Sequence, residues 1–163
     1  MTLLRFALAA ASALACSAAI AASGAVVSKA VEIKGKTPAD IQAKFGAFCA
    51  IKDWHPAVAE CVESKEGEAT FRTLTLKDGG VIKEKQMSRN AEGYSYKIVE
   101  SPLPVKDYMA TFSIKPDGDG EGNARVSWTA SFQAKDKPEA EAKTVIQGII
   151  DGGLASLAEM AAK

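Results

Sequence analysis

The sequence predicts an α+β fold in which a curled, seven-stranded antiparallel sheet surrounds one long C-terminal helix. Strand-like segments lie only a few residues apart, as is typical of antiparallel neighbours joined by hairpins. Two short helical segments follow the first strand, and the last segment switches to helical periodicity. A sheet this wide must twist and curl, and one long helix is available to cover its inner face. Such an arrangement tends to leave a cavity between the sheet and the helix.

The first elements are one strand and two short helices. Ala25–Ile33 alternates loosely between apolar and polar residues, which predicts a strand. Thr37 and Asp40 form a capping pattern around a proline, and they predict a short helix over Pro38–Phe45. A second short helical segment is expected to end before Pro56, because proline disfavours the helical conformation at the residue before it.

Six further strands are predicted between residues 57 and 135. Each is rich in β-branched, aromatic or alternating residues and is bounded by turns that contain Gly, Asp or Pro. The predicted strands are Val58–Glu63, Ala69–Leu76, Val81–Met87, Tyr94–Val99, Tyr108–Ile114 and Ala124–Phe132. Connections this short leave no room for crossover helices, so neighbouring strands are expected to run antiparallel.

An apolar stripe at helical spacing predicts a long helix from about Pro138 to the C-terminus. The stripe comprises Ala142, Val145, Ile146, Ile149, Ile150, Gly153, Leu154, Leu157 and Ala161. Gly148, Gly152 and Gly153 lie inside this helix, where each glycine costs about 1 kcal/mol relative to alanine. Close approach of the helix to the sheet, which we favour, or room for a ligand would offset that cost.

Residues 1–22 have the pattern of a secretory signal peptide. Arg5 precedes an alanine-rich apolar run that closes on small residues at Ala19–Ala21 and is too short for a spanning helix. Cleavage near Ala21 would leave a mature domain of residues 25–163 in the periplasm or outside the cell. A rival interpretation is a lipoprotein site at Leu14–Cys16, in which Cys16 is acylated.

Charge and cysteine content limit the function further. Loss of the leader leaves 19 basic residues against 20 acidic residues, so no global basic field is available to attract nucleic acid. About 140 residues suffice for one domain and are too few for two. Cys49 and Cys61 would pair in an oxidising compartment. Two separate buried thiols is the interpretation that we favour, because the sequence does not show whether the two side chains meet.

The sequence contains no complete metal or nucleophile motif. Asp117–Asn123 resembles a calcium loop, but Trp128 occupies the position where an EF-hand needs glutamate, so a solvated hairpin loop is predicted. The only histidine, His55, and the two cysteines lack zinc-site spacing, and no Gly-x-Ser-x-Gly elbow occurs. We therefore expect no metal or cofactor. Catalysis would need isolated acid/base groups such as His55 or Glu84, although the strand pattern alone makes Glu84 an exposed carboxylate.

Aromatic residues share the predicted inner face of three strands. By alternation, Tyr94, Tyr96 and Ile98 lie on one face, as do Tyr108, Ala110, Phe112 and Ile114, and Val126, Trp128, Ala130 and Phe132. Tyrosine and tryptophan carry polar groups that need partners when they are buried. This favours a pocket that holds water or a polar ligand, and a packed core whose hydroxyl groups reach its edge is the alternative.

Five stretches together resemble the START-like, polyketide cyclase/dehydrase-like (SRPBCC) superfamily. They are FCAIKDWHPAVAECV, FRTLTLKDGGVIKEKQM, YSYKIVESPLPVKDYMATFSI, RVSWTASF and GIIDGGLASLAEMA, and the similarity runs from about Val26 to the C-terminus. The resemblance implies a helix-grip fold with an internal ligand cavity and no assigned catalytic residue. It implies ligand contacts from Trp54, His55, Thr73, Thr75, Glu84, Tyr96, Ile98, Leu103, Tyr108, Ala110, Trp128, Ile149 and Gly153.

Within the superfamily, the chain resembles the abscisic-acid-receptor-like subgroup, in which gate and latch loops close the cavity. Lys77–Gly80 lies at the gate position and Leu103–Val105 at the latch position. His55 lies where the receptors carry a basic residue that meets the ligand, and Glu84 where they carry a pocket glutamate, so the resemblance replaces the exposed-carboxylate interpretation. The receptors' Ser-Gly-Leu-Pro gate and His-Arg latch are absent, so hormone sensing and phosphatase docking are not implied.

The chain also resembles MxaD-like exported accessory proteins of bacterial methanol oxidation, through its leader, its size of 17.1 kDa, WHPAVA and TLTLKDGG. This resemblance implies an exported binding or accessory protein with a small apolar or aromatic ligand, which assists contact between a quinoprotein methanol dehydrogenase and its cytochrome c. The alternative is a cyclase or dehydratase-type enzyme that acts on a small carbonyl or aromatic substrate, with His55 as acid or base and Tyr108 or Glu84 orienting it. Lipid carriage would need a purely aliphatic lining. No membrane span is expected after the leader.

Overall fold

One antiparallel sheet curls around one long helix in the computed structural model, which describes residues 24–118 and 122–163. The strands are β1 (Ala25–Ile33), β2 (Val58–Glu66), β3 (Ala69–Leu76), β4 (Val81–Asn90), β5 (Gly93–Glu100), β6 (Val105–Pro116) and β7 (Ala124–Ala134). The helices are α1 (Pro38–Phe45), α2 (Ile51–Trp54) and α3 (Glu139–Ala161). The strand order β1-β7-β6-β5-β4-β3-β2 confirms the predicted seven-stranded sheet and the helix-grip arrangement.

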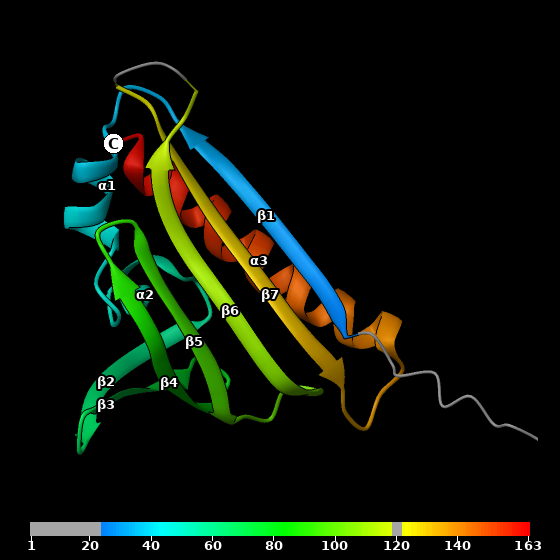
Figure 1. Ribbon diagram of the computed structural model, residues 1–163. Helices are drawn as coiled ribbons and strands as arrows, with labels where there is room; N and C mark the ends of the chain where they lie inside the picture. The colour runs from blue at the N-terminus through cyan, green and yellow to red at the C-terminus, as the bar shows by residue number, and fades with distance from the viewer. Residues whose placement is uncertain (1–23, 119–121) are drawn as a thin grey trace, which may run out of the picture.

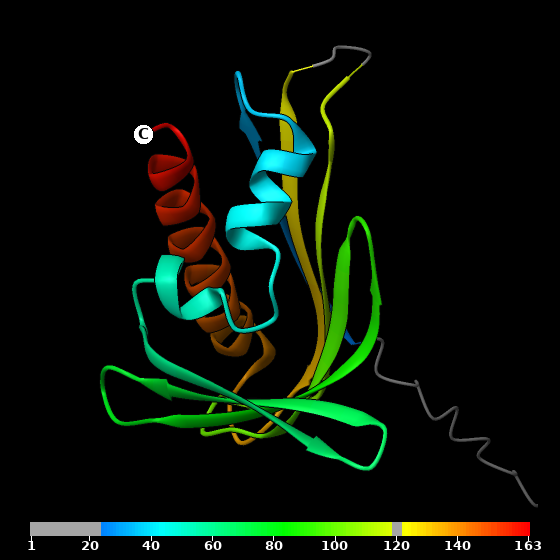
Figure 2. The same ribbon diagram turned by 90° about the vertical axis from the view of Figure 1, so that its left-hand side faces the viewer.

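Figures 1 and 2 show how the sheet and the helices are layered. Helix α3 lies along the inner face of the sheet, where it packs mainly on β1 and β7. Short helix α2 contacts both β2 and α3, so it bridges the far edge of the sheet to the long helix. The strands in the middle of the sheet therefore face α2 and α3 across an interior that side chains must fill.

The predicted local signals account for the helix boundaries. At the start of α1, the Thr37 hydroxyl accepts a hydrogen bond from the Asp40 amide at 3.2 Å, and the Asp40 carboxylate accepts one from the Thr37 amide at 2.9 Å. The Thr37 hydroxyl also donates to the Asp40 carboxylate at 2.7 Å, and the two bonds that this carboxylate accepts, from the hydroxyl and the amide of Thr37, lower the pKa of Asp40. Helix α2 ends at Trp54, and His55 before the proline is extended, with φ −88° and ψ 120°.

Several strands are longer than predicted, because they extend into mainly polar residues beyond their predicted ends. Strands β2 and β4 continue to Glu66 and Asn90, and β6 begins at Val105 rather than Tyr108. These extra residues extend the pairing between neighbouring strands, but they do not alternate between apolar and polar residues. The sequence pattern therefore does not predict them. In α3, Val145 was placed on the apolar stripe, but its side chain is 39% exposed, because it turns away from the sheet toward solvent.

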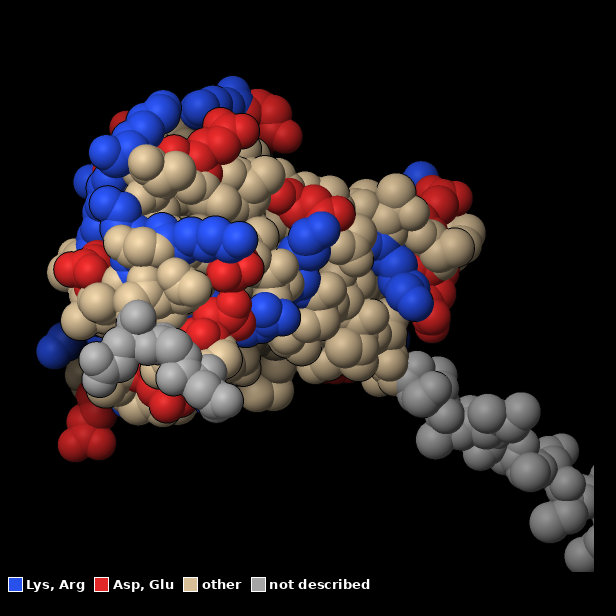
Figure 3. All heavy atoms as spheres, turned by 90° about the horizontal axis from the view of Figure 1, so that it is seen from above, with Lys and Arg blue, Asp and Glu red and all other residues tan. Residues whose placement is uncertain are grey.

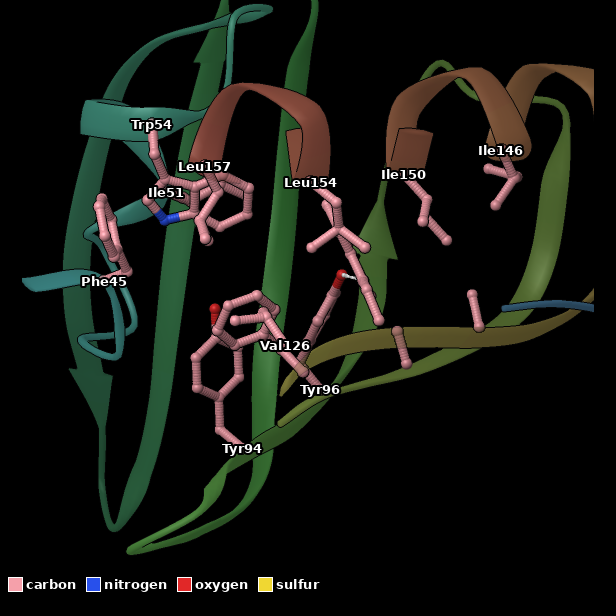
Figure 4. Packing of buried hydrophobic residues seen from close by; sticks show 14 of the residues in the cluster. Phe45, Ile51, Trp54, Tyr94, Tyr96, Val126, Ile146, Ile150, Leu154 and Leu157 are labelled. Carbon is pink, nitrogen blue, oxygen red and sulfur yellow. Dashed lines mark hydrogen bonds between the residues drawn. The ribbon is translucent and has the colours of Figure 1, made fainter. Parts of the chain in front are cut away.

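Aromatic rings from the middle of the sheet fill most of the interior. Tyr94, Tyr96, Tyr108, Phe112, Trp128 and Phe132 are all buried, so the predicted inner face is confirmed. Figure 4 shows Ile146, Ile150 and Leu154 of α3 pointing toward this layer. Ring pairs such as Tyr94 with Phe112, whose centroids are 5.5 Å apart, make the layer continuous.

Cys49 and Cys61 form a disulfide, so the prediction of two separate thiols was wrong. Cys49 lies in the turn before α2, and Cys61 lies on edge strand β2, which runs back beside that helix. The pairing depends on this tertiary return of the chain, which no local pattern reveals. The predicted leader and Cys16 lie outside the described residues, as do Asp119, Gly120 and Glu121 of the predicted solvated loop. In the part of the chain that is described, no helix has the length and hydropathy to cross a membrane.

Candidate functional site

A cavity of about 60 Å³ lies between the inner face of the sheet and helices α2 and α3. Its wall includes most of the residues that the sequence indicated, and they come from four strands, the β5–β6 connection, α3 and the residue after α2. They are His55, Glu84, Tyr96, Ile98, Leu103, Tyr108, Trp128 and Ile149. Aliphatic residues complete the wall, among them Leu74 and Leu76 of β3 and Ile146 of α3.

The other five predicted residues do not line this cavity. Thr73 and Thr75 alternate along β3 with Leu74 and Leu76, so they project from the opposite face of the strand. The structure therefore does not bring these two predicted ligand contacts to this cavity.

Trp54 is 2% exposed, and its ring stacks on Phe112 with centroids 5.6 Å apart, which makes it part of the packed core. Ala110 is buried on β6 without reaching the cavity. Gly153 is buried behind the ring of His55. These three residues therefore shape the site indirectly.

His55 fastens the end of α2 to the long helix. Its Nε2 lies 3.0 Å from the carbonyl oxygen of Ile149 in α3, and its Nδ1 accepts a hydrogen bond from the Ala57 amide at 3.2 Å. Because Nδ1 accepts, the proton belongs on Nε2, which donates to Ile149. Burial lowers the pKa of His55, and this keeps the ring neutral. Both ring nitrogens are thus occupied, which leaves no free lone pair for acid/base chemistry.

The absence of a side chain at Gly153 makes room for the His55 ring in this contact. A Cβ atom at this position would lie 2.6 Å from Cδ2 of His55 and 3.0 Å from Cζ3 of Trp128. A Cβ atom at Gly148 or Gly152 would meet nothing within 4 Å. Close packing, the explanation favoured from the sequence, therefore applies to Gly153, and the packed groups are two side chains rather than the sheet backbone.

The polar centre of the site is a buried ion pair that joins β3 to β4. Arg72 is 0% exposed and Glu84 is 4% exposed, and Nε of Arg72 donates to Oε2 of Glu84 at 2.5 Å. Nη1 of Arg72 donates to the carbonyl oxygen of Phe48 and, at 3.4 Å, to the hydroxyl of Tyr94. Glu84 raises the pKa of Arg72 against the opposing effect of burial, so the guanidinium stays charged.

An aromatic cage surrounds the guanidinium of Arg72. Its Cζ atom lies 4.2 Å from the ring centroid of Phe48, 4.9 Å from that of Tyr96 and 5.5 Å from that of Tyr94. Such cation–π contacts gain strength where water is excluded. This cage explains why tyrosines, rather than aliphatic residues, occupy positions 94 and 96. Aliphatic side chains there would pack well but would not stabilise the buried charge.

Sequence reasoning missed Arg72. Leu74 and Leu76 face the cavity, so alternation places Arg72 on the inner side of β3 as well. Phe71, although apolar, lies on the outer face of the strand. There the amino groups of Lys83 and Lys85 lie 4.9 and 5.7 Å from its ring centroid and cover it.

Two of the quoted motifs meet at one end of the cavity. Ala57 and Val58 of WHPAVA line it together with Leu76 of TLTLKDGG, and the Lys77 amide donates to the Ala57 carbonyl at 2.9 Å. The turn after β3 also approaches the β5–β6 connection, because a Cβ atom at Gly80 would lie 3.5 Å from Cγ of Pro102. The predicted gate and latch segments are therefore neighbours.

The surface charges and the possible metal ligands were compared over the described residues. Figure 3 shows Lys and Arg side chains interspersed with Asp and Glu on the face seen from above. Over residues 24–118 and 122–163, no group of three His, Cys, Asp or Glu side chains is placed to hold a metal ion.

Comparison with known proteins identifies relatives of the whole domain. A family model described as polyketide cyclase / dehydrase and lipid transport matches residues 24–162. The structure of protein XoxI from Bacillus cereus is 26% identical, with a TM-score of 0.76 over 83% of this chain and 94% of that one. An uncharacterized protein from Bacillus thuringiensis is 25% identical, with a TM-score of 0.78 over 85% of this chain and 100% of that one.

More distant structures share the fold alone. The ZhuI aromatase/cyclase from a Streptomyces species is 11% identical, with a TM-score of 0.67 over 85% of this chain and 93% of that chain. A START superfamily protein from Mycobacterium smegmatis is 15% identical, with a TM-score of 0.67 over 83% of this chain and 96% of that chain. No curated protein matches the chain.

Substitution of two glycines in α3 tests the contact between His55 and this helix. Gly153→Ala should destabilise the protein by about 1–3 kcal/mol, because the new methyl group overpacks the site and displaces the His55 ring. Gly152→Ala is the matched control and should stabilise by up to about 1 kcal/mol, because its Cβ enters open space and alanine favours helix. Urea unfolding followed by tryptophan fluorescence measures both, and equal effects would contradict the proposed contact.

Removal of one partner tests the buried ion pair. Arg72→Met should cost about 3–5 kcal/mol, because it leaves the Glu84 carboxylate buried without its counter-charge. The double variant Arg72→Met/Glu84→Leu removes both charges and should recover most of that loss. Chemical denaturation of both variants measures the difference, and a double variant as unstable as the single one would rule out the pairing as the source of the cost.

Proposed function

Because the chain belongs to the polyketide cyclase / dehydrase and lipid transport family, we propose that it is an exported binding protein that holds a small molecule in its internal cavity and performs no chemistry on it. The observation that carries this proposal is the small, largely aliphatic and aromatic cavity between β3–β7 and the helices. Apolar walls with a few oriented polar groups are typical of ligand sites.

The volume of the cavity limits the ligand. Typical pockets for drug-sized molecules have about 300–1,000 Å³, whereas this cavity has about 60 Å³. The site is therefore much smaller than a typical pocket for a drug-sized molecule. A lipid chain or a fused aromatic ring system does not fit this volume.

Export is part of the proposal and rests on two independent features. Residues 1–22 have the composition of a signal peptide, and Cys49 is joined to Cys61. Disulfides persist in the periplasm and outside the cell and are rare in reducing compartments. A mature domain of residues 25–163 in the periplasm satisfies both features.

The finer proposal is an accessory role toward a periplasmic methanol dehydrogenase and its cytochrome c. It rests on the WHPAVA and TLTLKDGG stretches, which resemble MxaD-like proteins and meet beside the cavity. Lys77 and Asp78 in the turn of the second stretch are exposed, so they are available to a protein partner. A partner at this turn would lie directly beside the ligand site.

A cyclase or dehydratase-type enzyme is the second candidate. The observation in its favour is that Glu84 and Tyr108, a carboxylate and a phenol, line the same cavity. His55 argues against it, because both of its ring nitrogens are already bonded. The volume argues against it as well, because an aromatic substrate would need more space than about 60 Å³.

A ligand titration tests the binding function. Small apolar and aromatic molecules should shift the indole N–H resonance of Trp128, which lines the cavity. Ile149→Phe should abolish these shifts, because the larger ring fills the cavity from α3. Val145→Phe is the matched control on the exposed side of the same helix and should leave them unchanged. Absence of binding by every compound in the series would overturn the function.

Reconstitution tests the accessory role. Addition of the mature protein to a purified periplasmic methanol dehydrogenase and its cytochrome c should raise the rate of cytochrome reduction at limiting concentrations. Lys77→Glu should reduce this gain, because it reverses a charge at the proposed contact turn. Lys143→Glu on the exposed side of α3 should not. A rate that does not depend on the added protein would remove this role and leave the binding function intact.

A further inference from the structure

A second hollow lies on the outer face of the sheet, where β5 and β6 separate. The pairing of β5 with β6 ends at Lys97 and Met109, although β5 continues beside β4 to Glu100. Asp107 has φ 51°, and the register of β6 with β7 shifts between Lys106 and Met109, so β6 bends at this point. Figure 1 shows the two strands diverging toward the connection that joins them. The open groove at this place has a volume of about 960 Å³.

The groove has the size and the lining of a contact surface. Its volume is at the upper end of the range of about 300–1,000 Å³ that is typical of ligand pockets. Two large apolar side chains, Val99 and Met109, line it, and each is 47% exposed. The charged residues of the lining are Lys97, Lys106, Lys135, Glu100 and Asp107. An apolar centre within a polar rim is the usual arrangement of a surface that contacts another protein.

Two lysines occupy directly opposite positions on the strands beside this groove. Lys85 of β4 pairs with Lys97 of β5, and Lys97 pairs with Met109 of β6. The Cβ atoms of directly opposite residues lie about 5 Å apart, so the side chains of Lys85 and Lys97 occupy one small area of the outer face. Like charges in this arrangement destabilise a sheet. Folding alone therefore does not account for this pair of lysines.

The acidic residues nearby do not neutralise the pair. Glu66 accepts a hydrogen bond from the amino group of Lys83 at 2.8 Å, and Glu100 is opposite Lys83 in the register of β4 with β5. These two carboxylates therefore belong to Lys83. Over residues 24–118 and 122–163, neither Lys85 nor Lys97 forms an ion pair. The lysine pair thus lacks a counter-charge from the described part of the chain.

The groove as a whole has an excess of positive charge. Three exposed lysines line it and Lys85 lies beside it, whereas only two carboxylates, those of Glu100 and Asp107, are present in the lining. The mature chain carries 19 basic residues against 20 acidic residues, so this local excess is not a property of the whole molecule. A local positive surface on a protein of nearly zero net charge selects an acidic partner by charge complementarity.

Two features of the groove favour a polypeptide over other anions. Val99 and Met109 lie among the lysines, and a phosphate backbone has no apolar side chain to cover them. On the side that faces β6, residues 98–100 of β5 have no strand partner in the register. The free edge of a strand is a template for pairing with an extended peptide.

We propose that this groove binds an extended acidic segment of a partner protein. Carboxylates of the segment meet Lys85 and Lys97, and its apolar side chains cover Val99 and Met109. Lys106 and Lys135 extend the positive surface along the groove. The proposal goes beyond the binding function of the internal cavity and does not depend on a ligand in it.

Peptides of equal length and different charge test the proposal on the mature protein. The probe is the octapeptide Glu-Glu-Val-Glu-Glu-Val-Glu-Glu with a C-terminal fluorophore, and its binding is measured by fluorescence anisotropy. Its Kd should be at least about tenfold lower than that of the same peptide with Gln in place of Glu, because hydrogen bonds between charged groups are the stronger ones. Equal Kd values for the two peptides would overturn the proposal. Equally tight binding of an eight-nucleotide oligothymidylate or of phosphatidylglycerol vesicles would overturn a protein as the partner.

Two charge reversals locate the binding site. Lys97→Glu should raise the Kd of the acidic peptide at least about tenfold, because it places a carboxylate in the centre of the positive surface. Lys143→Glu is the matched control, since it makes the same change of charge at an exposed position of α3 and should alter the Kd by less than about twofold. The urea midpoint of Lys97→Glu should not fall, because the variant replaces a like-charge pair by an opposite-charge pair beside Lys85. Equal effects of the two variants on the Kd would overturn the groove as the site and would leave the function of the internal cavity untouched.

Discussion

The buried pair of Arg72 and Glu84 is the interaction on which the rest of the interior depends. Two ionised groups at 0% and 4% exposure need several partners to offset the loss of water. Arg72 finds them in the Phe48 carbonyl, the Tyr94 hydroxyl and a cage of rings. The rings that surround the guanidinium also occupy the interior, and this leaves a cavity of about 60 Å³. The size of the ligand site thus follows from the way in which a charge is buried.

The same constraint explains why the N-terminal helices are fastened in two places. Phe48 supplies both a carbonyl and a ring to Arg72, and its neighbour Cys49 is bonded to Cys61 on β2. A few residues later, His55 bonds to the Ile149 carbonyl of α3. The segment between these anchors forms one wall of the cavity. Its position is set by a covalent bond and a hydrogen bond, and the adjacent Trp54 packs into the core.

The sequence was sufficient for the fold and for most of the cavity wall. Alternation and turn residues placed the strands, and the helical stripe placed α3, because these signals are local. The inner face of β3 was not identified, because it carries the charged residue Arg72 while the apolar Phe71 lies on the outer face. Lysine side chains cover the phenylalanine, and an ion pair with an aromatic cage holds the arginine, so both residues are buried by contacts between strands. The disulfide was missed for the same reason, since it joins segments that only the tertiary fold brings together.

His55 shows how a residue type suggests chemistry that its environment prevents. As the only histidine, beside a tryptophan and at the edge of a cavity, it fits the description of a general acid or base. Its two bonded nitrogens and the absent side chain of Gly153 instead make it a clamp between helices. Glu84 and Tyr108 also line the cavity, and their ordinary pKa values lie on either side of neutrality. Burial raises the pKa of both, so at neutral pH the tyrosine remains a donor, while Arg72 favours the charged acceptor form of the glutamate. The cavity wall therefore offers a ligand a charged acceptor and a neutral phenol, while its histidine is held by the helices.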